Sequence, residues 1–200
     1  MENPFKQAQT AVYIANIPSS SEIKPVYPLA RQIEIENCKS EKTRREKYYA
    51  WKLLAFAVGD LERFRFEKNQ NGKWQCDGFA FSLSHSKNAV AVAISKTAVG
   101  VDIELYKNKP QESVVRRIFT EEERTIFQSL NERERAEFFT RKWTEKESVF
   151  KALDLPAFFP ADFTKFTGRT YGRDIAVNGE TYRVCVACDT PPIFYEKLKI

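Results

Sequence analysis

The sequence predicts an α+β protein built of two similar, pseudo-symmetric lobes, each an antiparallel sheet packed on a long helix. Long stretches with helix-start and helix-end signals occur in both halves, and short apolar runs typical of strands accompany them. Residues 47–53 also resemble residues 137–143, about ninety positions later. This similarity is equally compatible with a duplicated half and with chance. If it reflects duplication, we expect lobes of residues 1–98 and 99–200, with the active site in the cleft between them.

Local signals define the elements of the N-terminal half. Ser40 is typical of a helix N-cap, because its hydroxyl can accept a backbone N–H of the first turn, and Gly59 is typical of a helix end. Alternating apolar and charged residues before a turn rich in Asn and Gly predict a hairpin. We therefore expect a strand over residues 11–17 ended by Pro18, a helix from Ser40 to about Val58, a hairpin over 61–67 with its turn at 69–72, and a buried strand over 89–94.

The C-terminal half carries similar signals. Thr120 and Glu123 have the spacing of a capping box, in which each side chain bonds the backbone N–H of the other residue. Two prolines after residue 153 are incompatible with a continuing helix. We therefore expect a strand over 99–105, a helix that starts at Thr120, a helix over 132–153 ended by Pro156 and Pro160, and short strands around Asn178 and Gly179.

Composition narrows the functional classes. The chain has 42% hydrophobic and 30% charged residues, as an ordinary folded protein does. No uncharged apolar run approaches the roughly 20 residues of a membrane span, and none follows Lys6 as a secretory signal would require. We therefore expect a cytoplasmic protein. The spacing of Cys185 and Cys188 is compatible with zinc, but a strand would turn the two thiols to opposite faces, so we expect free thiols.

The positive charge is unevenly distributed. Residues 1–100 contain 15 Lys and Arg against 10 Asp and Glu, whereas residues 101–200 contain 17 of each kind, so the first half carries the whole net charge of +5. The excess fits either a solvated helix face or a site for a polyphosphate or an acidic protein. Nucleic-acid binding is disfavoured, since no binding motif accompanies it. The basic residues are densest at Lys39, Lys42, Arg44, Arg45, Lys47 and Lys52.

Two carboxylates in the segment 100–105 have the spacing of a cation site. Alternate residues of a strand share a face, so Asp102 and Glu104 would project from the same surface about 7 Å apart. Ligands that are all oxygen favour magnesium or manganese over zinc. A solvated strand face with two acids would give the same pattern.

A second group lies on the predicted helix 132–153. Trp143, Glu147 and Lys151 are successive i, i+4 positions on one side of that helix. Glu147 is a candidate third metal ligand or base, and Lys151 a candidate partner of a phosphate oxygen. An exposed ion pair between Glu147 and Lys151 is the alternative interpretation.

The single histidine stands between two serines. Ser84, His85 and Ser86 together could form a cradle for a phosphate monoester from two hydroxyls, an imidazole and turn amides. A purely structural histidine is the alternative. The sequence contains no P-loop, no G-x-G-x-x-G motif and no G-x-S-x-G motif.

Taken together, these segments resemble the 4′-phosphopantetheinyl transferase superfamily, in its monomeric, two-lobed, surfactin-synthetase-activating type. The resemblance covers about residues 40–155. Its markers, in the family's order and spacing, are Ser84-His85-Ser86, Gly100-Val101-Asp102-Ile103-Glu104 and Trp143-x-x-Lys146-Glu147-x-x-x-Lys151.

The resemblance implies transfer of the phosphopantetheine arm of coenzyme A to a serine of an apo acyl or peptidyl carrier protein, with release of adenosine 3′,5′-bisphosphate. It implies that Asp102, Glu104 and Glu147 hold Mg²⁺, with Mn²⁺ as an alternative ion, against the pyrophosphate. Glu147 would also activate the serine, and Lys151 would neutralise charge on the pyrophosphate.

The resemblance also implies accessory contacts. Glu123 corresponds to a further acidic position near the metal, with Glu122 as its rival, and Trp74 replaces the proline of the family's Gly-Lys-Pro motif. The coenzyme would be bound by Arg44, Arg45, Lys73, Ser84 and His85, with Ser84 and His85 on the nucleotide 3′-phosphate.

Two other functions fit the same residues. One is a non-catalytic module that binds coenzyme A or a carrier protein, although such a module need not keep all three carboxylates and Lys151. The other is a metal-dependent phosphohydrolase of nucleotides, which would position a water molecule in place of a serine. In either case we expect no membrane or nucleic-acid partner.

Overall fold

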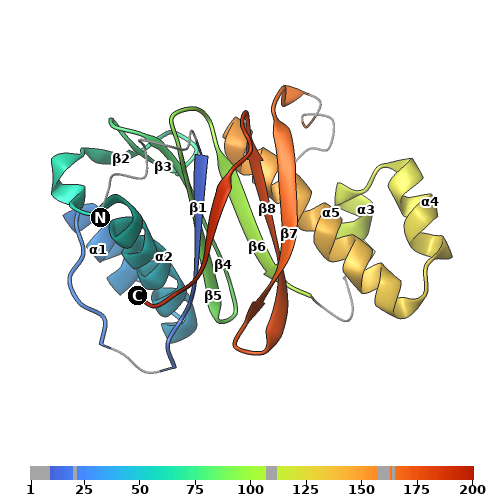
Figure 1. The fold of residues 1–200 in the computed structure, drawn as a ribbon, viewed down its shortest axis with the longest axis horizontal. Helices are drawn as coiled ribbons and strands as arrows, with labels where there is room; N and C mark the ends of the chain where they lie inside the picture. The colour runs from blue at the N-terminus through green and yellow to red at the C-terminus, as the bar shows by residue number, and fades with distance from the viewer. Residues whose placement is uncertain (1–9, 20–21, 107–111, 157–162, 164) are drawn as a thin grey trace.

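The computed structural model describes residues 10–19, 22–106, 112–156, 163 and 165–200, and it confirms a mixed α and β architecture (Figure 1). In that part of the chain the helices are α1 (Leu29–Glu36), α2 (Glu41–Val58), α3 (Glu112–Ile118), α4 (Glu121–Ser129) and α5 (Glu132–Leu153). The strands are β1 (Thr10–Asn16), β2 (Phe66–Lys68), β3 (Trp74–Cys76), β4 (Ala80–Ser86), β5 (Ala89–Ser95), β6 (Gly100–Leu105), β7 (Arg169–Val177), β8 (Glu180–Cys188) and β9 (Ile193–Leu198).

Two sheets lie face to face, with α2 on the outer side of one and α5 on the outer side of the other (Figure 1). The first sheet has the strand order β4-β5-β1-β9, and the second has the order β6-β8-β7. A small third sheet pairs β2 with β3. Strands β1 and β9 run parallel, and the other paired strands are antiparallel.

Strand β5 is apolar on both faces because it lies between α2 on one side and the second sheet on the other. Val90, Val92 and Ile94 belong to the core under α2, whereas Ala89, Ala91 and Ala93 belong to the core between the two sheets. The small alanines allow the sheets to approach each other, and the larger side chains fill the space below the helix. The predicted buried strand over residues 89–94 is confirmed.

The caps predicted from the sequence fix the helix ends. The Ser40 hydroxyl accepts the N–H of Thr43 at the start of α2, and Gly59 ends that helix with a φ of 90°. Thr120 and Glu123 form the predicted capping box of α4. The bounds of α5, Glu132–Leu153, are those that the sequence predicted.

Other elements differ from the prediction. Helices α1 and α3 were not expected, and residues 61–63 form one turn of 3₁₀ helix where the hairpin was expected to begin. Strands β7 and β8, of nine residues each, form a hairpin around Asn178 and Gly179, which both have positive φ and so match a tight turn. Pro160 lies outside the described residues.

The division into two pseudo-symmetric lobes at residue 98 stays a prediction. Each long helix does pack on its own sheet. However, β9 belongs by sequence to the second half and pairs in parallel with β1, so the first sheet draws strands from both ends of the chain (Figure 1).

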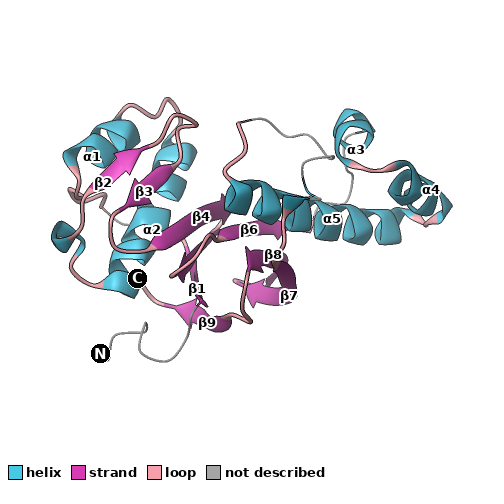
Figure 2. Ribbon diagram, turned by 90° about the horizontal axis from the view of Figure 1, so that it is seen from above, coloured by secondary structure: helices cyan, strands magenta, loops and turns pink. Residues whose placement is uncertain are grey.

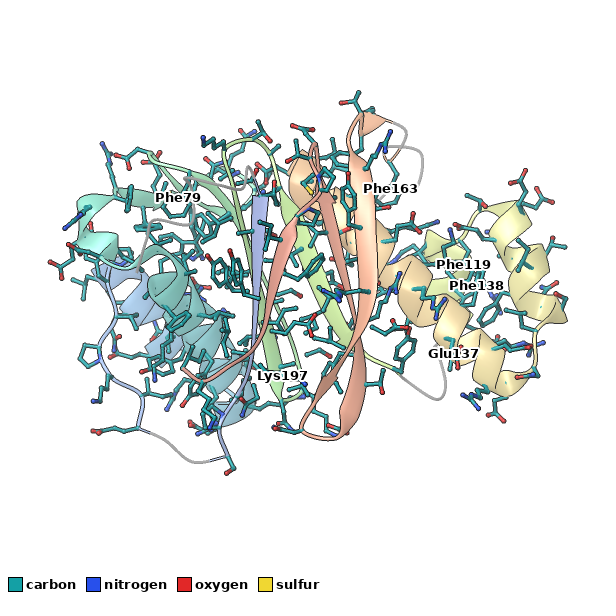
Figure 3. All side chains as sticks on the ribbon, in the orientation of Figure 1. Phe79, Phe119, Glu137, Phe138, Phe163 and Lys197 are labelled. Carbon is teal, nitrogen blue, oxygen red and sulfur yellow. The ribbon has the colours of Figure 1, made fainter. Side chains whose placement is uncertain are left out.

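Helices α3 and α4 lie beside the N-terminal end of α5 (Figure 2). An aromatic cluster joins them, in which the ring centroids of Phe119 and Phe138 are 5.6 Å apart (Figure 3). Phe127 packs against both rings. This cluster gives the projecting helices a small core of their own.

Gly100 allows β6 to approach α5 closely. A Cβ atom at this position would lie 1.9 Å from the carbonyl oxygen of Ser148 and 2.5 Å from the backbone nitrogen of Ala152. Only glycine fits this spacing. The close approach brings the polar face of β6 under the polar face of α5.

The two thiols of the C-x-x-C motif point away from each other. Cys185 and Cys188 are both buried in β8 and both free. Cys188 lies in the core between the sheets, whereas Cys185 lies near Ser148 on α5. The expectation that the two thiols face opposite sides of a strand is confirmed. None of the described helices is long and apolar enough to cross a bilayer.

Candidate functional site

A row of serine side chains joins the edges of the two main sheets. Ser82, Ser84 and Ser86 alternate along β4 and all face β6. Their hydroxyl oxygens accept the backbone N–H groups of Val101, Ile103 and Leu105, at 3.0, 3.2 and 3.2 Å respectively. The serines thus satisfy backbone donors that would otherwise form an open edge of β6. We call this contact the serine bridge.

The serine bridge also holds the two carboxylates of β6. The Ser84 hydroxyl donates to Asp102 Oδ1, and the Ser86 hydroxyl donates to Glu104 Oε2, each at 2.7 Å. Asp102 is only 4% exposed. Its second oxygen, Oδ2, is buried and has no hydrogen-bond partner among the residues that the structure describes.

Glu147 approaches the same carboxylates from α5. Burial raises the pKa of Glu147 to about 7, and the negative charges of Asp102 and Glu104 add to this effect while Lys151 opposes it. The structure therefore brings together two strand carboxylates and one helix carboxylate that lie far apart in the sequence. Burial, reinforced by the charges of Asp102 and Glu104, favours the protonated form of Glu147 near neutral pH more than in an exposed glutamate.

Lys151 lies one helical turn after Glu147 and turns toward β6. Its ammonium donates to Asp102 Oδ1 at 2.7 Å, to the Val101 carbonyl at 3.1 Å and to Ser84 Oγ at 3.3 Å. The ion pair with Asp102 is mostly buried. Lys151 thus places a positive charge directly against the acidic cluster.

The oxygen donors fit a hard divalent cation. Asp102 Oδ2 is a buried carboxylate oxygen without a hydrogen-bond partner in the described part of the chain, and the charges of Asp102 and Glu104 add to the effect of burial on the pKa of Glu147. Both features favour binding of a cation. Among the described residues, no three His, Cys, Asp or Glu side chains are already arranged as a metal site. The metal role of Asp102, Glu104 and Glu147 therefore stays a prediction.

Glu123 lies in a different ion network. Its carboxylate pairs with the Nζ atoms of Lys146, at 2.5 Å, and Lys142, at 3.5 Å. Burial acts to raise the pKa of Glu123, but the hydrogen bond from Lys146 and its other partners outweigh burial and lower it. Lys146 also donates to the Ile118 carbonyl, so the network fastens α3 and α4 to α5. The accessory role of Glu123, or of its neighbour Glu122, stays a prediction.

Ser84 and His85 face opposite sides of β4. Ser84 turns toward β6, whereas His85 Nδ1 lies 3.4 Å from Glu46 Oε2 on α2. Burial, together with the positive charges of Lys151 and Arg31, lowers the pKa of His85 to about 4, so its imidazole is neutral at pH 7. The two residues predicted to share one phosphate are therefore not on a common surface.

The other three residues predicted to bind coenzyme have partners within the protein. Lys73 Nζ donates to the carbonyl of Lys151 at 2.6 Å, near the C-terminal end of α5. Arg44 pairs with Glu41 at 3.2 Å, and Arg45 donates to the Pro18 carbonyl. Lys73 and Lys151 both line a pocket of about 200 Å³ beside β4. Lys73 is thus the one of these three that lies next to the carboxylate cluster.

Comparison with known proteins identifies the C-terminal part of the chain. Residues 98–190 match the family model of the 4′-phosphopantetheinyl transferase superfamily. This segment is similar to the proteins of that superfamily. The recognition made from the sequence motifs is confirmed. The matched segment contains Asp102, Glu104, Glu147 and Lys151, and also Glu123.

Two curated relatives are both named as 4′-phosphopantetheinyl transferases. The 4′-phosphopantetheinyl transferase HetI of Nostoc is 36% identical over 77 residues, which are 38% of this chain and 32% of that protein. The 4′-phosphopantetheinyl transferase gsp of Aneurinibacillus migulanus is 34% identical over 100 residues, which are 50% of this chain and 42% of that protein. The matches thus span less than half the length of either relative.

Sequence reasoning missed two features of the elements around the carboxylate site. The serine bridge was detectable, because serines at alternate positions 82, 84 and 86 of a strand must share one face. Glu46 was not detectable, since it looks like part of an exposed i, i+4 pair with Lys42. In the structure the Glu46 side chain is only 9% exposed. Burial raises the pKa of Glu46; Lys42 opposes this shift, and Glu104 reinforces it.

Proposed function

We propose that this chain transfers the 4′-phosphopantetheine arm of coenzyme A to a serine hydroxyl of an apo acyl or peptidyl carrier protein. The match of residues 98–190 to the superfamily model and the names of the two relatives support this reaction class. The observation that carries the proposal is the environment of Glu147, which is partly buried near two further carboxylates and has a pKa of about 7.

The reaction needs a group that removes the proton of the attacking serine. The serine oxygen forms a bond to the phosphorus attached to pantetheine, the bond from that phosphorus to the bridging pyrophosphate oxygen breaks, and adenosine 3′,5′-bisphosphate leaves with that oxygen. Glu147 accepts the serine proton, for which a pKa near the working pH is best suited. Lys151 lies one turn away and offsets negative charge on the pyrophosphate.

Asp102, Glu104 and Glu147 would hold a divalent cation, magnesium or manganese. When bound, the cation would neutralise charge on the pyrophosphate oxygens. The buried Oδ2 atom of Asp102, which has no partner among the described residues, supports this assignment. Binding would also favour loss of the proton from Glu147, because a nearby cation stabilises the carboxylate form.

Coenzyme binding is assigned to Arg44, Arg45, Lys73, Ser84 and His85, and accessory support of the acidic cluster to Glu123. The coenzyme would take over bonds that these side chains now make within the protein. We further propose that the site lies in a cleft between two lobes of a monomer. The position of the carboxylates, between β4 of the first sheet and α5 on the second, supports this arrangement.

The direct test is mass spectrometry of apo carrier proteins incubated with the chain, coenzyme A and magnesium. We expect the mass of one phosphopantetheine group to be added to a single serine, and no addition when the serine is replaced by alanine or when EDTA is present. Carriers from fatty-acid and from peptide synthases should be compared, because the sequence does not favour either. Tight binding of carrier and coenzyme without transfer would replace this proposal with the binding module, and release of nucleotide without carrier would replace it with the phosphohydrolase.

A further inference from the structure

The turn between β2 and β3 is bonded to the C-terminal end of α5. Asn69 Nδ2 donates to Asp154 Oδ2, and Asn71 Nδ2 donates to the carbonyl of Asp154 at 2.8 Å. Lys73 Nζ donates to the carbonyl of Lys151 at 2.6 Å. Each bond joins residues that are 78 to 85 positions apart in the sequence. We call these three bonds the turn–helix contact.

The turn has a fixed shape of its own. Asn69 Oδ1 accepts the backbone N–H groups of Asn71 and Lys73, each at 3.0 Å. Gly72 has a φ of 77°, and its N–H donates to the carbonyl of Asn69 at 2.9 Å. Since the amide oxygen of Asn69 holds the turn together, its amide nitrogen is the group left to face α5. The turn therefore presents a donor to Asp154 in one orientation.

Asp154 supplies an acceptor that the end of the helix does not itself need. The residue ends α5 in the left-handed conformation, with a φ of 52° and a ψ of 45°. Glycine is the most common residue at such a position, because a side chain disfavours the conformation. The N–H groups of Asp154 and Leu155 both bond the carbonyl of Phe150, so the backbone alone closes the helix. The carboxylate of Asp154 is thus explained by its bond to the turn.

The turn–helix contact sets the spacing of two lysines from opposite halves of the chain. Lys73 and Lys151 line the same pocket of about 200 Å³. Burial lowers the pKa of Lys73; Asp154 opposes this shift, and the charge of Lys151 reinforces it. The two like charges are therefore close enough to repel each other. The bond from Asn69 to Asp154 opposes this repulsion, because it keeps the turn against α5.

We propose that Asp154 is a positioning residue that acts through Asn69 to keep the ammonium group of Lys73 beside that of Lys151, so that the pocket between them is shaped for the coenzyme before it binds. An arrangement that exists before binding reduces the loss of conformational freedom on binding. That the ligand is coenzyme A rests on the proposed function. The effect of Asp154 is therefore on the affinity for the coenzyme and not on the affinity for the carrier protein.

The test exchanges the two members of the bond between Asn69 and Asp154. N69D keeps the oxygen that holds the turn but places a second carboxylate against Asp154, and N69D/D154N restores one donor and one acceptor. Calorimetric titration with coenzyme A should show about tenfold weaker binding by N69D and recovery to within about twofold of wild type by the double variant. The KM for the carrier protein should stay at the wild-type value in both. The matched control Q70E adds the same charge at an exposed position of the same turn and should keep the wild-type affinity.

Equal affinities of wild type and N69D, or no recovery in N69D/D154N, would overturn the role of Asp154. Equal weakening in Q70E would do so as well, because charge alone would then explain the loss, and so would failure of the wild type to bind coenzyme A. If N69D does not fold, D154G removes the carboxylate while glycine keeps the left-handed backbone. That variant should also bind coenzyme A more weakly, and wild-type affinity would overturn the proposal.

The two proposals fail separately. Absence of transfer in the mass-spectrometric assay, with the expected pattern of affinities, would remove the proposed reaction and leave the positioning role of Asp154. Transfer to a carrier protein by a wild type and an N69D variant of equal coenzyme affinity would remove the positioning role and leave the reaction.

Discussion

Glu34 and Glu147 are both partly buried glutamates, yet their surroundings shift their pKa values in opposite directions. Burial acts to raise the pKa of each. Around Glu34 the donors Lys47, Trp74, Arg31 and Lys68 outweigh burial and lower the pKa to about 2. Around Glu147 the charges of Asp102 and Glu104 reinforce burial, and the opposing charge of Lys151 is insufficient, so the pKa rises to about 7.

The comparison shows that partners rather than burial decide what such a carboxylate can do. Glu34 remains an anion over the whole physiological range and can only organise cations. Glu147 can gain or lose a proton near neutral pH, as a general base must. Excess positive charge therefore surrounds Glu34, and excess negative charge marks the proposed catalytic site. Four sets of variants test this contrast.

The largest effect is expected from Glu147→Gln. Loss of a general base lowers rates by about 10² to 10⁴-fold, so transfer to a carrier protein should fall by at least about a hundredfold. The amide has nearly the same shape, so the fold should persist, as circular dichroism can verify. Glu145→Gln on the same helix is the control, because the Glu145 side chain is 41% exposed and pairs with Lys142. Unchanged activity of the Glu147 variant would remove it from the mechanism.

Gly100→Ala should be the most destabilising of these substitutions. The added methyl would meet the backbone of α5 at Ser148 and Ala152, which cannot move without shifting the helix. We expect a loss of roughly 3 kcal/mol in the free energy of unfolding, measured by denaturant titration. Displacement of α5 should also separate Glu147 from β6 and bring the pKa of Glu147 back toward 4.5. Gly72→Ala is a useful comparison, because that glycine has a positive φ, but a Cβ atom there would meet no described atom within 4 Å.

Opposite pH dependences of stability should separate the two glutamates. The folded pKa of Glu147 lies above its unfolded value, so its stabilisation is complete below about pH 4.5 and is lost as the pH rises through 7. For Glu34 the folded pKa lies below the unfolded value, so its stabilisation is complete above about pH 4.5 and is lost as the pH falls toward 2. The difference in the free energy of unfolding between wild type and Glu147→Gln should therefore decrease by about 2 kcal/mol from pH 4.5 to 8. The corresponding difference between wild type and Glu34→Gln should decrease by a similar amount as the pH falls from 5 toward 2. The same pH dependence of this difference for both variants would contradict the contrast.

The smallest effects are expected in the serine bridge. Ser82→Ala leaves the buried N–H of Val101 without a partner and should cost about 2 kcal/mol of unfolding free energy. Ser86→Ala affects the more exposed N–H of Leu105 and should cost about 1 kcal/mol. Only Ser86→Ala also removes a donor from Glu104. A change in the pKa of Glu147, followed by NMR, should therefore occur in Ser86→Ala and not in Ser82→Ala.

Much of the fold could be predicted because its signals are local. The ends of α2 and α5 depend on side chains within one turn, such as Ser40 and Gly59, which act wherever the helix lies. The metal candidates Asp102 and Glu104 share a face by strand periodicity alone. Glu147 was a candidate third ligand, but its approach to Asp102 and Glu104 does not follow from periodicity, because it depends on Gly100 and on how α5 crosses β6.

The missed features depend on tertiary contacts. Helix α1 has weak local signals and is held by long-range bonds such as those from Lys47, Lys68 and Trp74 to Glu34. In the sequence, Glu34 is one acid in a basic region. Likewise, Ser84 and His85 lie on opposite faces because β4 continues to Ser86. The sequence analysis treated these residues as part of a turn, in which alternation does not apply.

The parallel pairing of β9 with β1 has a consequence for synthesis on the ribosome. Tyr13 stacks on Tyr195, with ring centroids 4.9 Å apart, and Ala11 pairs with Ile193, so this side of the first sheet is completed only after the other strands have been made. Until then the outer edge of β1 presents free backbone groups to neighbouring nascent chains. The interval before β9 arrives is therefore when this protein is most exposed to aggregation, and a chaperone would protect it best at that edge.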